Sequence, residues 1–219
     1  MRIIKYILKQ LRLLVLRNQR EENISNVLQN IIKKDKKKIT ILDFGSGKDA
    51  IISKYLINKF KNKSFNIKID CYDFYNKKIL KSLNKKNQFI NFYDVREFYK
   101  NNKKYDYCLI IDVLHHVGVD NTKYIVKILK KLKKKSKTVI IKDHFEWSFL
   151  SRILLIFMDF IGNYHNDVSI PNKYFTELQF NKMLSQNKIK IKKKILNKRY
   201  HSKIFLFLSN PNFHFLYII

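Results

Sequence analysis

Apolar residues recur along this chain with two different spacings, and the two kinds of segment alternate. Short apolar runs typical of buried strands occur at 39–42, 65–73, 89–94, 104–113 and 138–141. Between them, apolar residues three or four positions apart face lysines on the opposite side, at 50–60, 77–83 and 121–134. Alternating strands and helices predict an α/β fold, a doubly wound and mostly parallel sheet with helices on both faces.

The last part of the chain departs from this alternation. An apolar, aromatic helix is expected at 149–161, and Thr176 with Gln179 predicts a capped helix through Leu184. Three further strands are expected at 188–194, 204–208 and 214–219. The simplest arrangement is a terminal hairpin beside the parallel sheet, with an antiparallel C-terminal strand.

The first residues carry a broad apolar stripe with Lys and Arg between its members, at 2–17. The stripe fits a helix lying on an anionic membrane surface, or a first helix packed on the domain, and we favour packing. A second helix is expected at 23–34. The predicted organisation is a helical segment 1–37 packed on the core, then one domain 38–219 with a lid-like insertion at about 145–175.

Composition limits the class of protein. With 219 residues, 46% of them hydrophobic, the chain can bury a full core, which excludes a disordered protein despite a net charge of +29. That charge indicates either an anionic partner or A/T-rich codons behind the many Lys, Asn and Ile residues. We favour codon bias, because the lysines are spread across most predicted loops and helix faces.

Cys71 and Cys108 both lie inside strand-like runs. They are expected to be small core residues in a reducing compartment, neither a disulfide pair nor metal ligands. No signal peptide is visible, and no apolar run reaches the roughly 18 residues of a membrane span. The expected location is the cytoplasm, with peripheral contact at the inner membrane face through residues 1–17 as an alternative.

A candidate cofactor site begins where the first strand ends. Gly45 and Gly47 follow this strand and precede a helix, so the backbone can turn tightly and a cofactor can approach it closely. Asp73 ends the second strand, from which an acid reaches the ribose hydroxyls of a nucleotide. Asp70 lies earlier in the strand and is the weaker candidate.

These residues together resemble the class I S-adenosylmethionine-dependent methyltransferases. Residues 41–47 (ILDFGSG) look like the first motif of that family, and 105–117 (YDYCLIIDVLHHV) look like its fourth. Asp73 matches the acid that holds the ribose hydroxyls, and Asp94 matches the acid near the adenine amino group. The resemblance covers 38–145 and implies a Rossmann-like fold with S-adenosylmethionine as cofactor. The cofactor-binding residues that it implies are Asp43, Gly45, Ser46, Gly47, Asp49, Asp73, Phe74, Asp94, Val95 and Asp112.

One position departs from the family pattern. Asp49 stands where the first motif usually has its third glycine. An acid at this helix N-terminus can face the cofactor's ammonium group, so we expect binding to be retained rather than degraded. The stretch also lacks the GxGxxG arrangement of NAD-binding proteins, since position 50 is Ala.

Methyl transfer from a sulfonium is an in-line displacement, for which a protein aligns the acceptor with the methyl group and supplies a base. His115, His116 and His144 follow the fourth and fifth strands at their carboxyl ends, and histidine's ordinary pKa near 6.5 suits a base. Each is a catalytic candidate, with a backbone-bonded loop histidine as the alternative. Asp143 is expected to orient one of them, and Asp112 either contacts the site or caps the following turn.

The loop before Pro171 supplies the candidates for substrate contact, His165 and Asp167. The stretch 142–174 resembles a bacterial subgroup of the family whose substrate is unknown. We expect no metal site, because the chain shows neither HxxxH nor CxxC spacing.

Three classes of function follow. The leading class is methyl transfer to a small-molecule or lipid-precursor acceptor beneath a C-terminal lid. The second is an RNA methyltransferase using the basic surface, although no Asn-Pro-Pro-Tyr-type motif or appended RNA module is visible. The third is a non-catalytic cofactor-binding protein at a membrane. Salt-sensitive RNA binding would favour the second, and liposome binding through residues 1–17 the third. The methyl acceptor and the oligomeric state are not predicted.

Overall fold

The computed structural model describes residues 18–32, 38–47, 49–61, 66–75, 77–84, 88–163, 169–198, 200 and 210–219. The helix predicted at 2–17 and the strand predicted at 204–208 lie outside these residues. Among the helices that the described residues form, none combines the length and apolarity that crossing a membrane requires.

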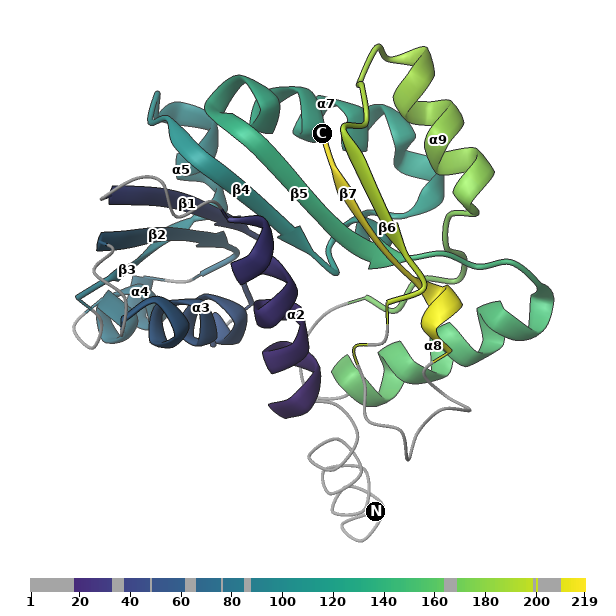
Figure 1. Ribbon diagram of the computed structural model, residues 1–219, viewed down its shortest axis with the longest axis horizontal. Helices are drawn as coiled ribbons and strands as arrows, with labels where there is room; N and C mark the ends of the chain where they lie inside the picture. The colour runs from purple at the N-terminus through teal and green to yellow at the C-terminus, as the bar shows by residue number, and fades with distance from the viewer. Residues whose placement is uncertain are drawn as a thin grey trace, which may run out of the picture.

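A seven-stranded sheet of order β3-β2-β1-β4-β5-β7-β6 forms the centre of the molecule (Figure 1). The strands are β1 (Lys38–Phe44), β2 (Asn66–Asp73), β3 (Ile90–Asp94), β4 (Tyr105–Ile111), β5 (Ser136–His144), β6 (Lys193–Leu196) and β7 (His214–Ile218). β1 to β5 pair in parallel, whereas β7 runs antiparallel to β5 and β6 antiparallel to β7. The predicted doubly wound, mostly parallel sheet with an antiparallel C-terminal strand is confirmed.

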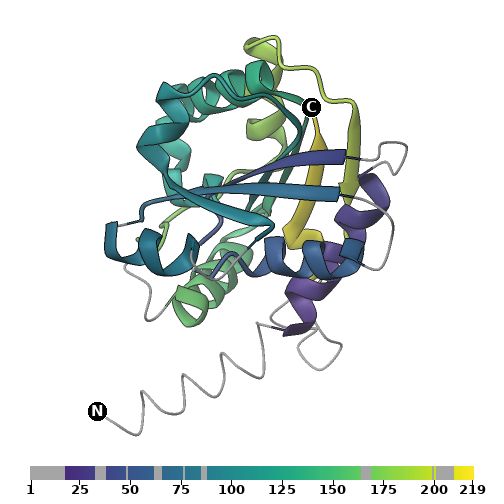
Figure 2. The same cartoon turned by 90° about the vertical axis from the view of Figure 1, so that its left-hand side faces the viewer.

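Helices cover both faces of this sheet (Figure 2). They are α2 (Asn18–Ile31), α3 (Ile51–Lys61), α4 (Lys77–Asn84), α5 (Val95–Lys100), α6 (Leu114–Val117), α7 (Thr122–Lys135), α8 (Phe149–Asn163) and α9 (Glu177–Gln186). Apolar residues of α2, α3 and α4 join the core on one face, and those of α5, α7 and α9 join the core on the other. Strand order reverses between β1 and β4, and such a switch point opens a crevice at the carboxyl ends of the strands.

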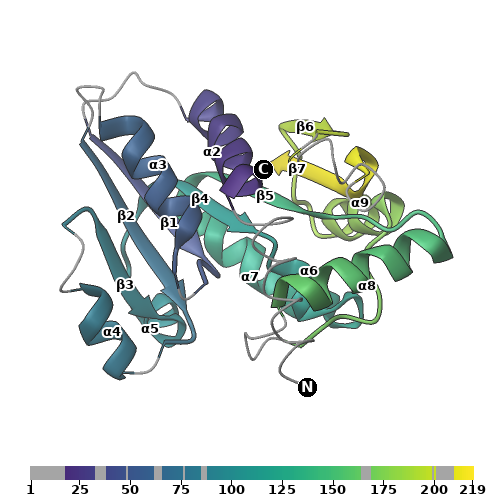
Figure 3. The same ribbon diagram turned by 90° about the horizontal axis from the view of Figure 1, so that it is seen from below.

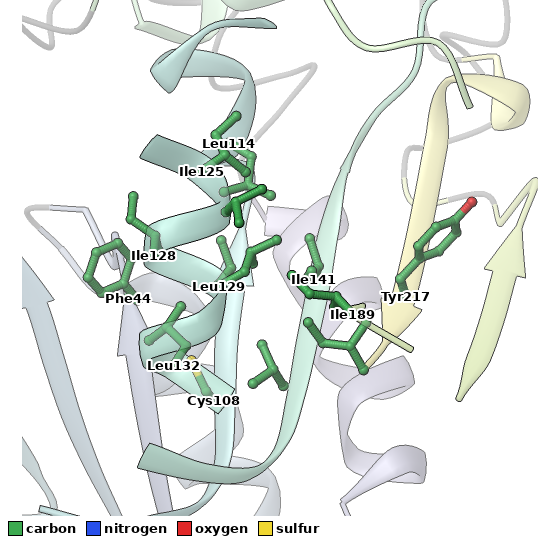
Figure 4. Packing of buried hydrophobic residues seen from close by; sticks show 14 of the residues in the cluster. Phe44, Cys108, Leu114, Ile125, Ile128, Leu129, Leu132, Ile141, Ile189 and Tyr217 are labelled. Atoms are coloured by element: carbon green, nitrogen blue, oxygen red, sulfur yellow. The ribbon is translucent and has the colours of Figure 1, made fainter. Parts of the chain in front are cut away.

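The amphipathic pattern of α7 shows how the core forms. Its apolar positions Ile125, Ile128, Leu129 and Leu132 are all buried, and they face the sheet in Figure 4. Lysines occupy most of its other positions, so the helix has a buried apolar face and a largely charged outer face. Cys108 lies in the same core and is free and buried, as is Cys71 on the opposite face, so both cysteines are core residues as predicted.

One predicted strand boundary is changed by local contacts, one predicted helix cap is confirmed, and one short helix was not predicted. The strand expected at 188–194 forms only from Lys193, because Ile189 is buried in the core and its backbone N–H donates to Leu184 O at the end of α9. The alternating apolar residues there serve core packing rather than strand pairing. The capping box of Thr176 and Gln179 is confirmed, with the Thr176 hydroxyl accepting from Gln179 N. The short helix α5, which was not predicted, begins directly after β3.

Two helices bring the end of the sheet into contact with the later chain. α6 follows β4, and α8 follows β5 after a short connection. Figure 3 shows α6 and α8 side by side. Because strands β1, β4 and β5 are parallel, the glycine turn, α6 and α8 all lie at the same edge of the sheet.

Candidate functional site

The glycine turn after β1 has the backbone conformation that glycine favours. Gly45 and Gly47 both have positive φ, 77° and 71°. A Cβ on Gly45 would lie 2.4 Å from Val113 Cγ2, so a side chain there would collide with the segment that follows β4. At Gly47 a Cβ would meet nothing within 4 Å. One glycine therefore serves packing, and the other leaves a bare backbone beside open space.

Asp73 lies against this turn. Its Oδ2 accepts from Gly47 N at 2.6 Å, and its Oδ1 accepts from Phe74 N at 2.7 Å. Phe74 itself is 83% exposed, an unusual state for a large aromatic residue at a strand end. The acid and the aromatic ring thus stand together at the carboxyl end of β2, beside the bare backbone of Gly47.

Two more acids end strands β1 and β3 and differ in environment. Asp43 is buried and accepts from the Ser53 hydroxyl at 2.6 Å. Burial raises its pKa to about 6, the Ser53 hydrogen bond opposing and the nearby Asp73 charge adding to the effect. Asp94 instead caps α5, accepting from Arg96 N and from the Arg96 guanidinium. The structure therefore gives Asp94 a capping role.

Of the remaining residues expected at the cofactor, Ser46 and Asp49 belong to the glycine turn and the segment that follows it, whereas Val95 lies after β3. The Ser46 hydroxyl is 2.8 Å from the Tyr75 hydroxyl, which in turn donates to Gly47 O at 2.6 Å. Asp49 is exposed and precedes the first residue of α3. Val95 is buried at the start of α5.

A cavity of about 250 Å³ opens between this turn and the later chain. Residues of the glycine turn, α2, the start of α3, the end of β4, α6 and α8 line it. They include Arg20, Glu21, Asp43, Gly45, Ser46, Gly47, Asp49, Asp112, His115, His116, His144, Met158, Asp159 and Asn163. The cavity therefore brings together most of the residues expected at the cofactor and three of the four catalytic candidates.

Asp112 lies at the centre of a cluster of basic side chains. Its carboxylate accepts from Lys142 Nζ at 2.6 Å and from Arg20 Nη2, and it lies 3.2 Å from His144 Nε2. Burial lowers the pKa of Lys142, whose side chain is fully buried. Asp112 has a φ of 54°, a conformation that non-glycine residues rarely adopt. Of its two expected roles, contact with the site is the one that fits this geometry.

Arg20 and Glu21 are cavity residues that sequence reasoning missed. Both belong to α2, and Arg20 reaches Asp112 across 92 positions of sequence. No local pattern around Arg20 distinguishes it from the many other basic residues of the chain. Only the packing of α2 against α3 brings it to the cavity.

His115 is held between two carboxylates. Its Nδ1 lies 2.5 Å from Asp143 Oδ1 and its Nε2 lies 3.3 Å from Asp159 Oδ2. Burial disfavours the charged ring, but Asp143 and Asp159 outweigh this and raise the pKa of His115 to about 10. A protonated ring cannot accept a proton at neutral pH. The general-base role considered for His115 therefore does not fit its environment, whereas the orienting contact expected of Asp143 is present.

His116 and His144 are held in the neutral form. Burial and the neighbouring His115 lower the pKa of His116 to about 4, and its Nδ1 lies 3.0 Å from Ser169 O. Burial, with the charge of Lys142, lowers the pKa of His144 well below its usual range. His116 is the more exposed of the two. The substrate candidates His165 and Asp167 lie outside the described residues.

The fold also gathers possible metal ligands that spacing in the sequence did not reveal. His115, His116 and Asp159 have ligand atoms within 4.8 Å of one another, as do His115, Asp143 and His144. Motifs such as HxxxH and CxxC lie within one segment of sequence, whereas the residues of these two groups come from α6, β5 and α8. Spacing is therefore an insufficient ground for rejecting a metal here.

Comparisons with known proteins concern the family and the fold of the chain. A family model described as a methyltransferase domain matches residues 16–188. No curated protein sequence matches the chain significantly. A family 2 O-methyltransferase from Planctomyces limnophilus, in complex with apigenin, is 14% identical and superposes with a TM-score of 0.57 over 90% of this chain and 55% of its own.

Two other solved structures differ in how much of their own length this chain matches. The mitomycin 7-O-methyltransferase MmcR is 12% identical with a TM-score of 0.57, covering 91% of this chain and 52% of its own. A SAM-dependent methyltransferase from Aquifex aeolicus is 13% identical with a TM-score of 0.56, covering 97% of this chain and 96% of its own. This chain thus spans about half the length of some matched proteins and nearly all of another. At such low identity these likenesses show the fold.

Proposed function

This chain belongs to the methyltransferase-domain family, and from that premise we propose that it transfers the methyl group of S-adenosylmethionine to a small-molecule or lipid-precursor acceptor. The observation that carries the proposal is a single cavity shared by the glycine turn and the histidine cluster. A cofactor bound on the turn side would present its methyl group toward α6 and α8. An acceptor bound next to α6 and α8 would then reach that methyl group within the same cavity.

The cofactor half of the proposal rests on the surroundings of Gly47. The open space at its Cβ position leaves room for a ligand to approach the backbone, and Asp73 lies within hydrogen-bond distance of the same turn. Exposed Phe74 supplies an aromatic surface next to that acid. Asp43 and Asp49 flank the same turn and give this part of the cavity an acidic wall, which suits a cofactor bearing ammonium and sulfonium charges.

The acceptor half rests on His116. It lines the cavity, it is held neutral, and its Nδ1 faces the carbonyl of Ser169, so the Nε2 lone pair is available. His115 lacks such a lone pair while it is protonated between Asp143 and Asp159. We therefore place the acceptor next to His116 rather than next to His115 or His144.

Calorimetric titration with S-adenosylmethionine tests the cofactor, with NADH as the negative control. We expect micromolar binding in the unaltered chain, and its loss in Asp73→Ala, since the proposed partner of this carboxylate is the ribose. The matched control is Asp106→Ala, because Asp106 is near the start of β4 and therefore at the opposite edge of the sheet. Circular dichroism establishes that each variant is folded. Unchanged affinity in Asp73→Ala would refute this placement of the cofactor.

RNA methylation is the second candidate, and one surface favours it. Residues of α7 and its neighbourhood form a lysine-rich groove, lined by Lys104, Lys123, Lys127, Lys130, Lys131, Lys134 and Lys135. Such a groove is suited to phosphates. Methyl transfer to RNA, with binding that weakens steeply as salt rises, would establish this function over the small-molecule one.

A further inference from the structure

We propose that His115, His116 and Asp159 form a binding site for a divalent transition-metal ion in the wall of the cavity. The three side chains come from α6 and α8, and their ligand atoms lie within 4.8 Å of one another. All three line the cavity, so an ion held by them would keep coordination positions open toward the acceptor. The proposal goes beyond methyl transfer and does not depend on it: an ion bound at His116 Nε2 would occupy the lone pair that faces the acceptor, and the ion would then meet the acceptor in place of the imidazole.

The support around each imidazole is the first argument for a metal. A histidine that binds a metal through one ring nitrogen usually donates its other N–H to a carboxylate or a backbone carbonyl. His115 has Nδ1 2.5 Å from Asp143 Oδ1, and His116 has Nδ1 3.0 Å from Ser169 O. Both contacts leave the Nε2 atoms as the available ligand atoms. His115 Nε2 is buried, and within the described part of the chain it faces Asp159 Oδ2 at 3.3 Å without a hydrogen bond of normal geometry.

The carboxylate ligand is supported in the same way. Asp159 accepts a hydrogen bond at its Oδ2 from the Tyr174 hydroxyl, at 2.5 Å. Ligating carboxylates are commonly fixed by such outer hydrogen bonds, and a fixed carboxylate needs less ordering when a metal binds. Asp159 Oδ2 lies 3.3 Å from His115 Nε2, so a single ion can contact both ligand atoms.

The other group of possible ligands, His115, Asp143 and His144, is less suitable. Asp143 already accepts from Leu114 N at 2.8 Å, from His144 N at 2.8 Å and from the His115 ring. Its oxygens thus serve to position α6 and the imidazole. His144 holds Nε2 3.2 Å from Asp112, and its Nδ1 is buried without a hydrogen bond in the described residues, so the weakness of this group lies in Asp143. Asp143 is a positioning residue behind His115, and without its carboxylate this group offers two ligands rather than three.

The ligand set also indicates the class of ion. Two imidazole nitrogens and one carboxylate oxygen suit Zn²⁺, Co²⁺ or Fe²⁺, whereas Mg²⁺ prefers oxygen ligands alone. Binding requires that the ion displace the proton from His115 Nε2. The carboxylates of Asp143 and Asp159 favour positive charge at this position, and they would do so for an ion as for a proton.

Metal uptake by the purified full chain tests the proposal, without cofactor or acceptor. The chain is freed of metal with a chelator, dialysed, and titrated with Co²⁺ followed by its visible absorption, and with Zn²⁺ followed by elemental analysis. We expect one ion per chain. His116→Ala and Asp159→Asn should weaken Co²⁺ binding by at least about 10-fold, whereas the matched control His144→Ala should retain the affinity of the unaltered chain.

Absence of stoichiometric uptake would overturn the proposal, as would unchanged affinity in both His116→Ala and Asp159→Asn. Loss of binding in folded His144→Ala would also overturn it, by favouring the other ligand group. If the variants fail to fold, histidine ¹⁵N resonances of the unaltered chain decide: Zn²⁺ must shift the Nε2 signals of two rings. Because no assay includes S-adenosylmethionine, failure here is distinct from failure of the proposed methyl transfer.

Discussion

Asp43 is a buried carboxyl at the end of β1, and we expect its replacement by asparagine to change how stability depends on pH. Burial is the largest cause of its raised pKa, which lies at about 6 against an ordinary value of 3.8. Its side chain is 3% exposed, so solvent does little to screen this effect. Asparagine keeps the shape and still accepts from Ser53, but it has no charge to desolvate.

The sign and size of the effect follow from linkage. The folded chain binds the Asp43 proton more tightly than the unfolded chain does, so protonation of Asp43 stabilises the fold. This contribution is fully present below about pH 4 and is lost as pH rises through about 6. A rise from 3.8 to about 6 corresponds to about 3 kcal/mol. The free energy of unfolding of Asp43→Asn, relative to the unaltered chain, should therefore increase by about 3 kcal/mol between about pH 4 and pH 7.

Urea unfolding followed by far-UV circular dichroism measures this difference at each pH. Other titrating groups contribute equally to both proteins and cancel in the comparison. Asp120→Asn is the matched control, because Asp120 is exposed, and its difference from the unaltered chain should stay flat. A difference for Asp43→Asn that changes by less than about 1 kcal/mol over this range would refute the assignment of a desolvated, proton-binding Asp43.

The same carboxyl links pH to the proposed cofactor. A cationic ligand in the cavity favours ionised Asp43, so binding below about pH 6 releases its proton. The affinity for S-adenosylmethionine should then fall by up to about 10-fold for each pH unit below that value. In Asp43→Asn the affinity should be weaker and should lack this dependence. Calorimetry in two buffers of different ionisation enthalpy measures the released proton directly.

Two further predictions concern packing around the site. Gly45→Ala should lower the free energy of unfolding by about 3 kcal/mol, because the added Cβ meets Val113 at a positive φ. Gly47→Ala, with open space around it, should lower the free energy of unfolding by about 1 kcal/mol. Chemical denaturation measures both values, and equal losses would contradict the steric account. Lys142→Met should destabilise the chain by about 2 kcal/mol, because the partly buried Asp112 carboxylate loses its amino partner while keeping Arg20, and adding Asp112→Asn should recover part of that loss in the same assay.

Local patterns in the sequence were sufficient for most of the sheet and for the glycine turn. The alternation of short apolar runs with amphipathic segments depends on which face of each element is buried, and burial leaves a periodic signature. β6 shows where that signature misleads, because Ile189 alternates like a strand residue while packing against the core after α9. The six-residue helix α5 is too short to show a period at all, and its start depends on the cap at Asp94.

The site was only partly predictable, for a different physical reason. His115, Asp143 and the glycine turn were recognisable because strand ends in a parallel sheet meet at one edge. The protonation states were not, since the raised pKa of His115 requires Asp159, a residue of α8 that spacing does not connect to α6. The ordinary pKa of histidine therefore does not describe His115, and the neutral form of His116 follows from burial and from the charge of the neighbouring His115.

The helix α2 contributes residues to the candidate site. Its Ile24 and Leu28 are buried in the core formed with α3, and this packing fixes where Arg20 lies. Arg20 contacts Asp112, whose other partners are His144 and the fully buried Lys142. Burying one carboxylate among these basic groups is tolerated only if their contacts are all made, because an unpaired buried charge is costly. The position of α2 is thus tied to the charge balance of the cavity.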